Sequence, residues 1–148
     1  MSKALILFCS ALIGVFLIDQ GVKTLFIDGF RWYGDFFSLV LTYNKGVAFS
    51  MLSFLEGNLK YIQLLLILTL FIYFFRDKES FQKYSLPAGL IMGAGLSNIY
   101  DRFIHGGVVD YFFWHYGFEF AVFNFADVMI NAGVVLILYL TWKKKPSI

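Results

Sequence analysis

Two aspartates near the end of the sequence are the residues best suited to chemistry. Asp110 follows Val108 and Val109 and precedes an aromatic run, and Asp127 ends the stretch Phe123-Asn124-Phe125-Ala126-Asp127. An ionisable group among apolar residues of a membrane protein is costly and is a functional-site hypothesis by default. Two carboxyl groups that converge are also enough to activate a water molecule against an amide bond. We therefore expect the chemistry of this chain at these two residues.

Polar residues around Asp127 share one face of a helix. Asn124, Asp127 and Asn131 are spaced by three and four residues, which places them on one side of a helix. No opposite charge lies three or four residues from Asp127, so an ion pair within the helix does not explain this acid and a functional role is favoured. Asp110 leaves two interpretations open. It is either a solvated loop acid or a buried group that the flexible Gly106-Gly107 pair folds back toward the helices.

Two further acids have a basic residue close by in the sequence. Asp19 and Lys23 are four residues apart, so they can form an ion pair on one helix face, and we predict a structural role for both. Asn98 and Asp101 are three residues apart, and Arg102 is adjacent. The Asp101–Arg102 pair is compatible either with holding a loop or with contacting a substrate.

Other chemistries are poorly supported by the sequence. His105 and His115 lie without metal-ligand spacing, so we expect no metal site. Ser50, Ser53 and Ser97 have no nearby lysine or histidine that would make one of them a nucleophile. No strand–glycine-rich–helix unit is present to bind phosphate. We therefore expect no cofactor. We also expect no nucleic-acid partner, because the basic residues are explained as the cytoplasmic flanks of the membrane helices described below.

The composition indicates that these groups are carried by a membrane protein. Hydrophobic residues make up 59% of the 148-residue chain and charged residues only 15%, which is outside the usual range of soluble domains. Four apolar stretches approach the roughly 20 residues that a spanning helix needs. We predict a single domain, residues 1–148, that is an all-α polytopic membrane protein with four transmembrane helices at about 4–27, 58–76, 86–104 and 124–142.

The distribution of charge predicts the orientation of these helices. Lys3, the segment from Arg76 to Lys83 and the tail Lys143-Lys144-Lys145 hold seven of the twelve basic residues but only two of the ten acids. Lysine and arginine accumulate on the cytoplasmic side, so both termini are predicted to be cytoplasmic. The first helix has the basic start of a signal peptide, but no A-x-A-like cleavage site follows it and we expect it to be retained. Cys9, the only cysteine, lies in this helix, which excludes an internal disulfide.

Three of the acids fall at a similar depth in the predicted helices. Asp19, Asp101 and Asp127 each lie 15 residues from the cytoplasmic end of an apolar stretch. This separation corresponds to about 22 Å of helical rise. In a hydrocarbon core of about 30 Å, the three acids would lie about 8 Å below the outer surface. A polar cavity that opens toward the outer leaflet is therefore expected.

Two segments outside the helices have the composition of strands. Asp35 to Tyr43 is rich in β-branched and aromatic residues and is followed by Asn44-Lys45-Gly46, a typical turn. Gly117 to Phe123 has a similar composition. Open sheet edges cannot lie in lipid, so we predict that these strands pair in a small extracytoplasmic β-layer on the membrane surface.

Several motifs, taken together, resemble those of a known family. In chain order they are Asp19 to Lys23, Asn44-Lys45-Gly46-Val47-Ala48-Phe49, Gly93 to Arg102, Val108-Val109-Asp110, and Phe123 to Asp127 with Ile130 and Gly133. They cover nearly the whole chain, and on them the chain resembles the lipoprotein signal peptidases, the signal peptidase II enzymes that process bacterial prolipoproteins. Ser97 stands where that family usually has glycine. We expect it to alter helix packing slightly and to touch no catalytic group.

The resemblance implies an intramembrane aspartic endopeptidase. Its substrates would be prolipoproteins whose lipobox cysteine carries a diacylglyceryl group, and it would cut the chain just before that cysteine. By motif, Asp110 and Asp127 correspond to a catalytic dyad, Asn44, Asn98, Arg102 and Asn124 to substrate-binding positions, and Asp19, Lys23 and Asp101 to structural polar positions. The family also implies a β-cradle and an active site near the extracytoplasmic face of the bacterial cell (inner, cytoplasmic) membrane, surrounded by lipid. A monomer is sufficient if one helix bundle forms the pocket.

Two other functional classes are alternatives on the sequence alone. A small transporter or proton-channel subunit would also carry intramembrane acids and amides, but it would place them at several depths along a path. A non-enzymatic scaffold subunit would tolerate replacement of the aspartates by asparagine, because its packing would survive the loss of charge.

Overall fold

The computed structural model describes residues 2–46, 51 and 53–143. Val47-Ala48-Phe49 of the turn motif, Ser50, and Lys144-Lys145 of the basic tail therefore lie outside the described residues. The elements, in order, are α1 (Lys3–Ile27), β1 (Trp32–Tyr33), β2 (Phe37–Asn44), the short 3-10 helix η2 (Ser53–Leu55), α2 (Glu56–Arg76), α3 (Lys78–Ile104), β3 (Val108–Trp114) and α4 (Phe125–Trp142).

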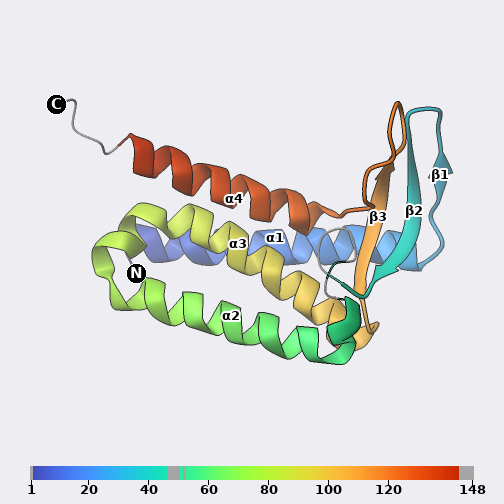
Figure 1. Ribbon diagram of the computed structural model, residues 1–148. Helices are drawn as coiled ribbons and strands as arrows, with labels where there is room; N and C mark the ends of the chain where they lie inside the picture. Colours follow the sequence, from blue (N-terminus) through green and yellow to red (C-terminus); the bar gives the residue numbers. More distant parts are fainter. Residues whose placement is uncertain (1, 47–50, 52, 144–148) are drawn as a thin grey trace.

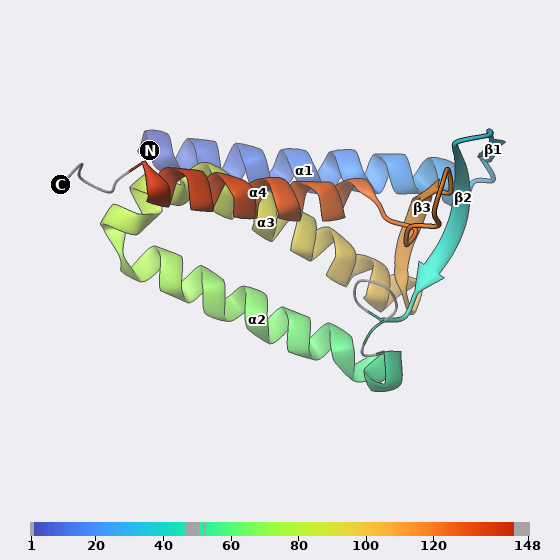
Figure 2. The same ribbon diagram turned by 45° about the horizontal axis from the view of Figure 1, so that its top comes forward.

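The four long helices run alongside one another, and the strands lie together at one end of the bundle (Figure 1). α3 packs against each of the other three helices. Figures 1 and 2 both show α2 diverging from α4 on the far side of α3. α1 begins and α4 ends at the end of the bundle away from the sheet. The long, mostly apolar helices predicted from the sequence are therefore present, together with a small sheet.

Among the described helices, three are long and apolar enough to cross a membrane: α1, residues 57–76 of α2, and α4. α3 is also long, at 27 residues, but it carries charged residues and buries twelve of its residues among its neighbours. A helix enclosed by other helices has little surface to present to lipid, so it can hold polar side chains that a lipid-facing helix cannot. Large apolar side chains such as Leu17, Leu65 and Leu138 are instead exposed on the outer helices.

α3 begins at Lys78, eight residues before the start predicted from hydropathy. The charged segment between the second and third predicted helices is helical from Lys78. Asp77 caps its start, accepting a hydrogen bond from the backbone N–H of Glu79 at 3.1 Å. Non-helical backbone angles at Tyr84 (φ −110°, ψ 15°) kink the helix ahead of Pro87. A proline cannot donate the helical hydrogen bond, so a kink at this point is its usual consequence.

Glycines allow α1 and α3 to approach closely. A Cβ atom added at Gly93 would lie 2.4 Å from the carbonyl oxygen of Leu12, and one at Gly89 would lie 2.6 Å from that of Phe8. Small residues four apart are typical of close helix contacts in membranes. The contact brings the polar residues of α1 against those of α3.

The sheet has the order β1-β2-β3, and all of its pairs are antiparallel. The strand predicted at Asp35 to Tyr43 is β2, which pairs with β3 so that Asn44 faces Val108 and Thr42 faces Asp110. The strand predicted at Gly117 to Phe123 is wrong. Only one isolated bridge, from Phe112 to Phe123, forms in that segment.

The reason for this difference is the pairing of β2 with β3, which runs from Phe37 opposite Trp114 to Asn44 opposite Val108, with one irregularity between Leu39 and Thr42. Val108–Trp114 occupies the edge of β2, and Gly117 with φ +76° then turns the chain back toward β3. A residue with positive φ favours glycine and interrupts an extended strand. Asp110 therefore lies in a strand of the sheet, whereas the sequence left open a solvated loop or a buried position.

Candidate active site

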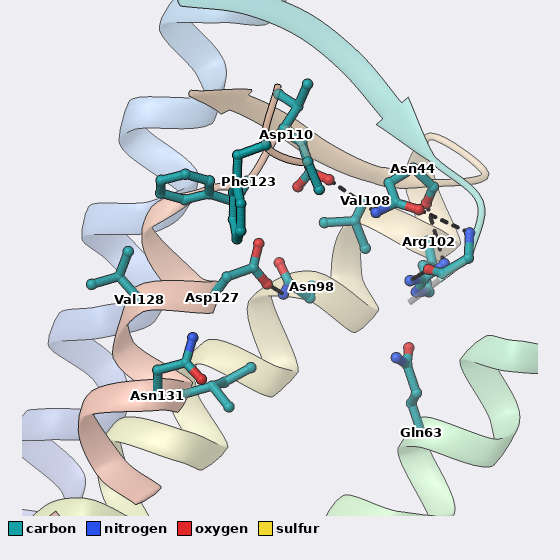
Figure 3. A pocket seen from close by; sticks show the side chains of 15 residues that line it. Asn44, Gln63, Asn98, Arg102, Val108, Asp110, Phe123, Asp127, Val128 and Asn131 are labelled. Atoms are coloured by element: carbon teal, nitrogen blue, oxygen red, sulfur yellow. Dashed lines mark hydrogen bonds between the residues drawn. The ribbon is translucent and has the colours of Figure 1, made fainter. Parts of the chain in front are cut away.

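A pocket of about 580 Å³ opens where α2, α3, α4 and β3 meet below the sheet (Figure 3). Its polar lining comprises Asn44, Gln63, Asn98, Arg102, Asp110, Asp127 and Asn131. Val108, Phe120, Phe123 and Ile130 are among its apolar lining residues. The cavity therefore brings both candidate aspartates together with three of the four predicted substrate-binding residues.

Asp110 is directed from β3 toward the pocket and is only 2% exposed, so the interpretation as a solvated acid is wrong. Gly106 with φ +74° reverses the chain after α3. A Cβ atom at Gly107 would lie 3.1 Å from the carbonyl oxygen of Asn44, so the chain passes close to β2 there. The Asp110 carboxylate accepts hydrogen bonds from the Asn44 amide at 3.1 Å and the Asn124 amide at 2.7 Å.

Asp127 lies in the first turn of α4, where it forms a capping box with Asn124. The Asn124 backbone N–H donates to Asp127 Oδ2 at 3.1 Å, and the Asp127 N–H donates to Asn124 Oδ1 at 2.9 Å. The other oxygen, Oδ1, accepts a hydrogen bond from the Asn98 amide at 3.1 Å. Asn124 therefore contacts both aspartates, and this fixes their relative position.

The surroundings of Asp110 change its acidity. Its burial and the nearby charge of Asp127 raise the pKa of Asp110 from 3.8 to about 7, against the opposing effects of the Asn44 and Asn124 hydrogen bonds. A carboxyl group with this pKa keeps its proton over much of the range up to neutrality. The site can therefore hold one proton between two acids near neutral pH.

Behind the pocket, Lys23 forms a buried ion cluster with two aspartates. Its Nζ lies 2.6 Å from Asp19 Oδ2 and 2.6 Å from Asp101 Oδ2, and all three side chains are fully buried. The ion pair predicted between Asp19 and Lys23 is confirmed, and Asp101 joins it from α3. Lys23 also donates to Asn98 Oδ1 at 2.8 Å. This hydrogen bond links the ion cluster to Asn98, whose amide donates to Asp127.

Each carboxylate of the cluster holds the backbone just before one of the candidate catalytic residues. Asp19 Oδ1 accepts a hydrogen bond from the N–H of Ala126 at 2.9 Å, and Asp101 Oδ2 accepts one from the N–H of Val109 at 3.1 Å. Ala126 precedes Asp127 and Val109 precedes Asp110. For Asp101, these contacts correspond to the first interpretation of its role, holding the chain after α3.

Arg102 lines the pocket and holds the turn after β2. One of its terminal nitrogens donates to the carbonyl oxygen of Asn44 at 3.3 Å and the other to that of Gly46. The turn itself is closed by a hydrogen bond from the Gly46 N–H to Asn44 Oδ1 at 2.9 Å. The Nε of Arg102 is buried with no hydrogen-bond partner among the described residues.

The family model for signal peptidase (SPase) II matches residues 11–143. The chain is also 58% identical to the lipoprotein signal peptidase of Sulfurimonas denitrificans over 89% of its length and 85% of that protein. It is 53% identical to the enzyme of the same name from Helicobacter pylori, over 92% of its length and 87% of that protein. The chain belongs to the signal peptidase II family.

The fold is also found in a solved membrane enzyme. A solved structure described as a bacterial membrane enzyme, determined by the in meso method at 2.3 Å resolution, superimposes with a TM-score of 0.77 at 25% identity. The match covers 93% of this chain and 91% of that one. Over this length the helix bundle and its sheet form one shared architecture.

Three polar residues of the chain were not singled out from the sequence as parts of the site. Ser97 donates to Asp19 Oδ2 at 2.6 Å and Gln20 donates to Asp101 Oδ1 at 2.7 Å, so both extend the ion cluster. Gln63 reaches the pocket from α2. Its signal in the sequence is its isolation, because it is the only strongly polar side chain between Lys60 and Thr69.

Among the residues that the structure describes, no group of three or more His, Cys, Asp or Glu side chains is placed to hold a metal ion. His115 instead lies 3.0 Å from the hydroxyl of Ser38, through its Nε2, on the sheet. Among the described residues, the polar groups that line the pocket are carboxyl, amide and guanidinium groups.

Proposed function

We propose that this chain is an intramembrane aspartic endopeptidase that cuts diacylglyceryl-modified bacterial prolipoproteins just before the lipidated cysteine. As a member of the signal peptidase II family, it removes signal peptides from prolipoproteins. The aspartic mechanism rests on one observation: Asp110 and Asp127 line the same pocket and are both hydrogen-bonded to Asn124. These two residues are the proposed catalytic dyad.

The dyad works with one carboxyl group protonated and the other ionised, because two like charges at close range are strongly unfavourable. Asp110 is the protonated member, since it is almost fully buried and its pKa is raised to about 7. Asp127 is the ionised member. It lies in the first turn of α4 and accepts the Asn124 N–H, and the N-terminus of a helix stabilises negative charge.

The reaction follows from these protonation states. Asp127 takes a proton from a water molecule while the water oxygen attacks the carbonyl carbon of the scissile amide, and Asp110 gives its proton to the carbonyl oxygen. When the tetrahedral intermediate collapses, the carbon–nitrogen bond breaks and Asp127 donates its proton to the leaving nitrogen. The hydroxyl proton of the intermediate returns to Asp110, so the dyad ends in its starting state.

The remaining polar residues position the dyad and the substrate. Asn44, Asn98 and Asn124 each donate a hydrogen bond to a catalytic carboxylate. In this proposal the Nε of Arg102, which is buried without a partner among the described residues, binds the substrate backbone near the cut, where Asn44 and Asn98 also line the pocket. Asp19, Lys23 and Asp101 have a structural role, because they are fully buried and do not line the pocket.

The chain is proposed to span the bacterial inner (cytoplasmic) membrane four times as a monomer, with both termini cytoplasmic and lipid around the bundle. α3 completes the four spans, because it runs the length of the bundle beside three apolar helices. The positive-inside rule supports the orientation, since the start of α1, the end of α4 and the α2–α3 junction lie at the end opposite the sheet. The sequence flanks all three with lysine or arginine. The sheet and the active site are then extracytoplasmic.

Cleavage of a diacylglyceryl-modified prolipoprotein by the purified protein in lipid, followed on a gel, tests this proposal. Asp110→Asn and Asp127→Asn are each expected to lower the rate by about 10²–10⁴-fold, because general acid–base catalysis contributes about this much. Asp35→Asn is the matched control, since Asp35 is an exposed carboxylate outside the pocket. Cleavage by folded Asp110→Asn at the rate of the control would show that the dyad is misassigned.

A further inference from the structure

Gln63 is a polar group of the pocket that the proposed reaction does not use. Its side chain extends from α2 toward the cavity (Figure 3). Its Oε1 atom is buried and has no hydrogen-bond partner among the residues that the structure describes. An unpaired buried carbonyl oxygen is unfavourable. It is therefore suited to a ligand that brings a hydrogen-bond donor into the pocket.

The position of Gln63 relative to the dyad limits which part of a substrate it can meet. Figure 3 shows Gln63 and Asn131 on opposite walls of the pocket, farther from β3 than Asp110 and Asp127. Asn131 follows Asp127 by about one helical turn in the direction away from the sheet. With the sheet on the extracytoplasmic side, the signal peptide runs from the dyad toward the cytoplasmic end of the bundle. The residues before the cut then pass between these two amides.

The chemistry of the unpaired atom selects the backbone of that peptide. The diacylglyceryl group offers ester oxygens and a thioether sulfur, which are acceptors and cannot donate to a carbonyl oxygen. The apolar side chains of a signal peptide offer no donor either. A peptide held extended for cleavage exposes backbone N–H groups that a helix would have paired internally.

We infer that Gln63 is a substrate-positioning residue whose Oε1 accepts a hydrogen bond from a backbone N–H of the signal peptide within the three residues before the cut. This contact pairs two groups that are otherwise unsatisfied at membrane depth, where an unpaired N–H is especially costly. It holds the signal peptide extended beside the dyad. The inference deepens the proposed function, because it takes this pocket as the place of cleavage.

The test combines a protein variant with a change in the substrate backbone. A lipidated prolipoprotein peptide is compared with three analogues, each with an ester in place of one backbone amide (oxygen for N–H) at one of the three residues before the cysteine. With the wild-type protein, one analogue is expected to lose about 3- to 10-fold in kcat/KM, the effect of one hydrogen bond. Methionine is similar in size to glutamine, and Gln63→Met is expected to lose a similar factor in kcat/KM on the normal peptide. On the affected analogue, Gln63→Met is expected to have the same kcat/KM as it has on the normal peptide.

Gln82→Met is the matched control, because Gln82 is an exposed glutamine on α3 that lies beside Ser2 and Lys3, outside the catalytic pocket. It is expected to respond to the esters as the wild type does. Gln63→Met is also expected to unfold at a temperature no lower than the wild type, since it removes an unpaired buried oxygen. A structural role for Gln63 would instead lower that temperature.

Two results would overturn the inference. One is cleavage of the normal peptide by Gln63→Met at the wild-type rate. The other is that, for every ester analogue, the fold-losses in kcat/KM caused by Gln63→Met and by the ester multiply when both changes are combined. The coupling between Gln63→Met and the backbone ester is measured on the cleavage reaction. It therefore does not depend on which carboxylates catalyse that reaction. Failure of the dyad assignment would appear separately, in the Asp110 and Asp127 variants.

Discussion

The carboxylate of Asp19 accepts a hydrogen bond from the backbone N–H of Ala126, although 107 residues separate the two in the chain. Asp101 holds the N–H of Val109 in the same way, and Lys23 joins the two carboxylates. The positions of both candidate catalytic residues are thereby set by one buried cluster before any substrate binds. Fixing reacting groups in advance is an established source of catalytic rate.

The first prediction concerns the cation at the centre of this cluster. Lys23→Met leaves Asp19 and Asp101 buried without their positive partner. Removing one member of a buried ion pair typically lowers the free energy of unfolding by about 3–5 kcal/mol. Thermal unfolding of the protein in detergent micelles measures the loss.

Lys60→Met is the control for this experiment. Lys60 lies over the rings of Tyr61 and Phe103, at 5.4 Å and 4.7 Å from their centroids. Losing cation–π contacts at a partly exposed site costs only about 0.5–1 kcal/mol for each contact. If Lys23→Met were no more destabilising than Lys60→Met, the cluster would not be holding the site together.

The second prediction uses two glycines in neighbouring helices. Gly93→Ala would place a Cβ atom 2.4 Å from the carbonyl oxygen of Leu12, so α1 and α3 must separate. Overpacking of this kind lowers the free energy of unfolding by about 1–3 kcal/mol. Gly14→Ala in α1 meets no atom within 4 Å and is expected to stabilise the helix by about 0.5–1 kcal/mol. Unfolding temperatures that shift in the same direction for both variants would contradict this account of the interface.

Local sequence patterns predicted the extents of three of the four long helices and an ion pair within one of them. Apolar length placed α1, α2 and α4 within two residues of their observed ends. The spacing of Asp19 and Lys23 predicted their ion pair because residues four apart lie on one helix face. The start of α3 was missed because a single residue, Asp77, separates it from α2.

Contacts between distant segments could not be read in the same way. The pairing of Asp101 with Lys23 depends on how α1 packs on α3, and the place of Asp110 depends on the register of β3 against β2. Neither is encoded in spacing along the chain. Gln63 shows the same limit. Its isolation in an apolar stretch marks it in the sequence, but the pocket that it lines forms only when residues of α3, α4 and β3 meet it.

The third prediction is a dependence of stability on pH. The pKa of Asp110 is raised from 3.8 to about 7 by burial and by the charge of Asp127. Between these values the folded protein binds a proton at Asp110 that the unfolded chain has released. Its contribution to stability is therefore complete below about pH 4 and is lost as the pH rises to about 7, with a slope of at most about 1.4 kcal/mol per pH unit.

Asp110→Asn is expected to reduce this slope, because asparagine does not titrate. The measurement is the free energy of unfolding of both proteins in detergent from pH 4 to pH 8. Cleavage by the wild type should also decline above about pH 7, where Asp110 loses the proton that it donates. An unchanged slope in Asp110→Asn would assign the titration to another group.

The fourth prediction concerns the orientation of the bundle. In a Cys9→Ala background, which removes the only cysteine, Glu119→Cys places a thiol on the exposed segment next to the sheet and Lys143→Cys places one just after α4. The basic end is expected to be cytoplasmic, so a membrane-impermeant maleimide should label Glu119→Cys in intact spheroplasts and Lys143→Cys only after the membrane is opened. Both variants should still cleave a prolipoprotein, which shows that each is folded when it is labelled. The opposite labelling pattern would place the dyad on the cytoplasmic side. The signal peptide could then not run from the dyad past Gln63 toward the cytoplasm, as proposed.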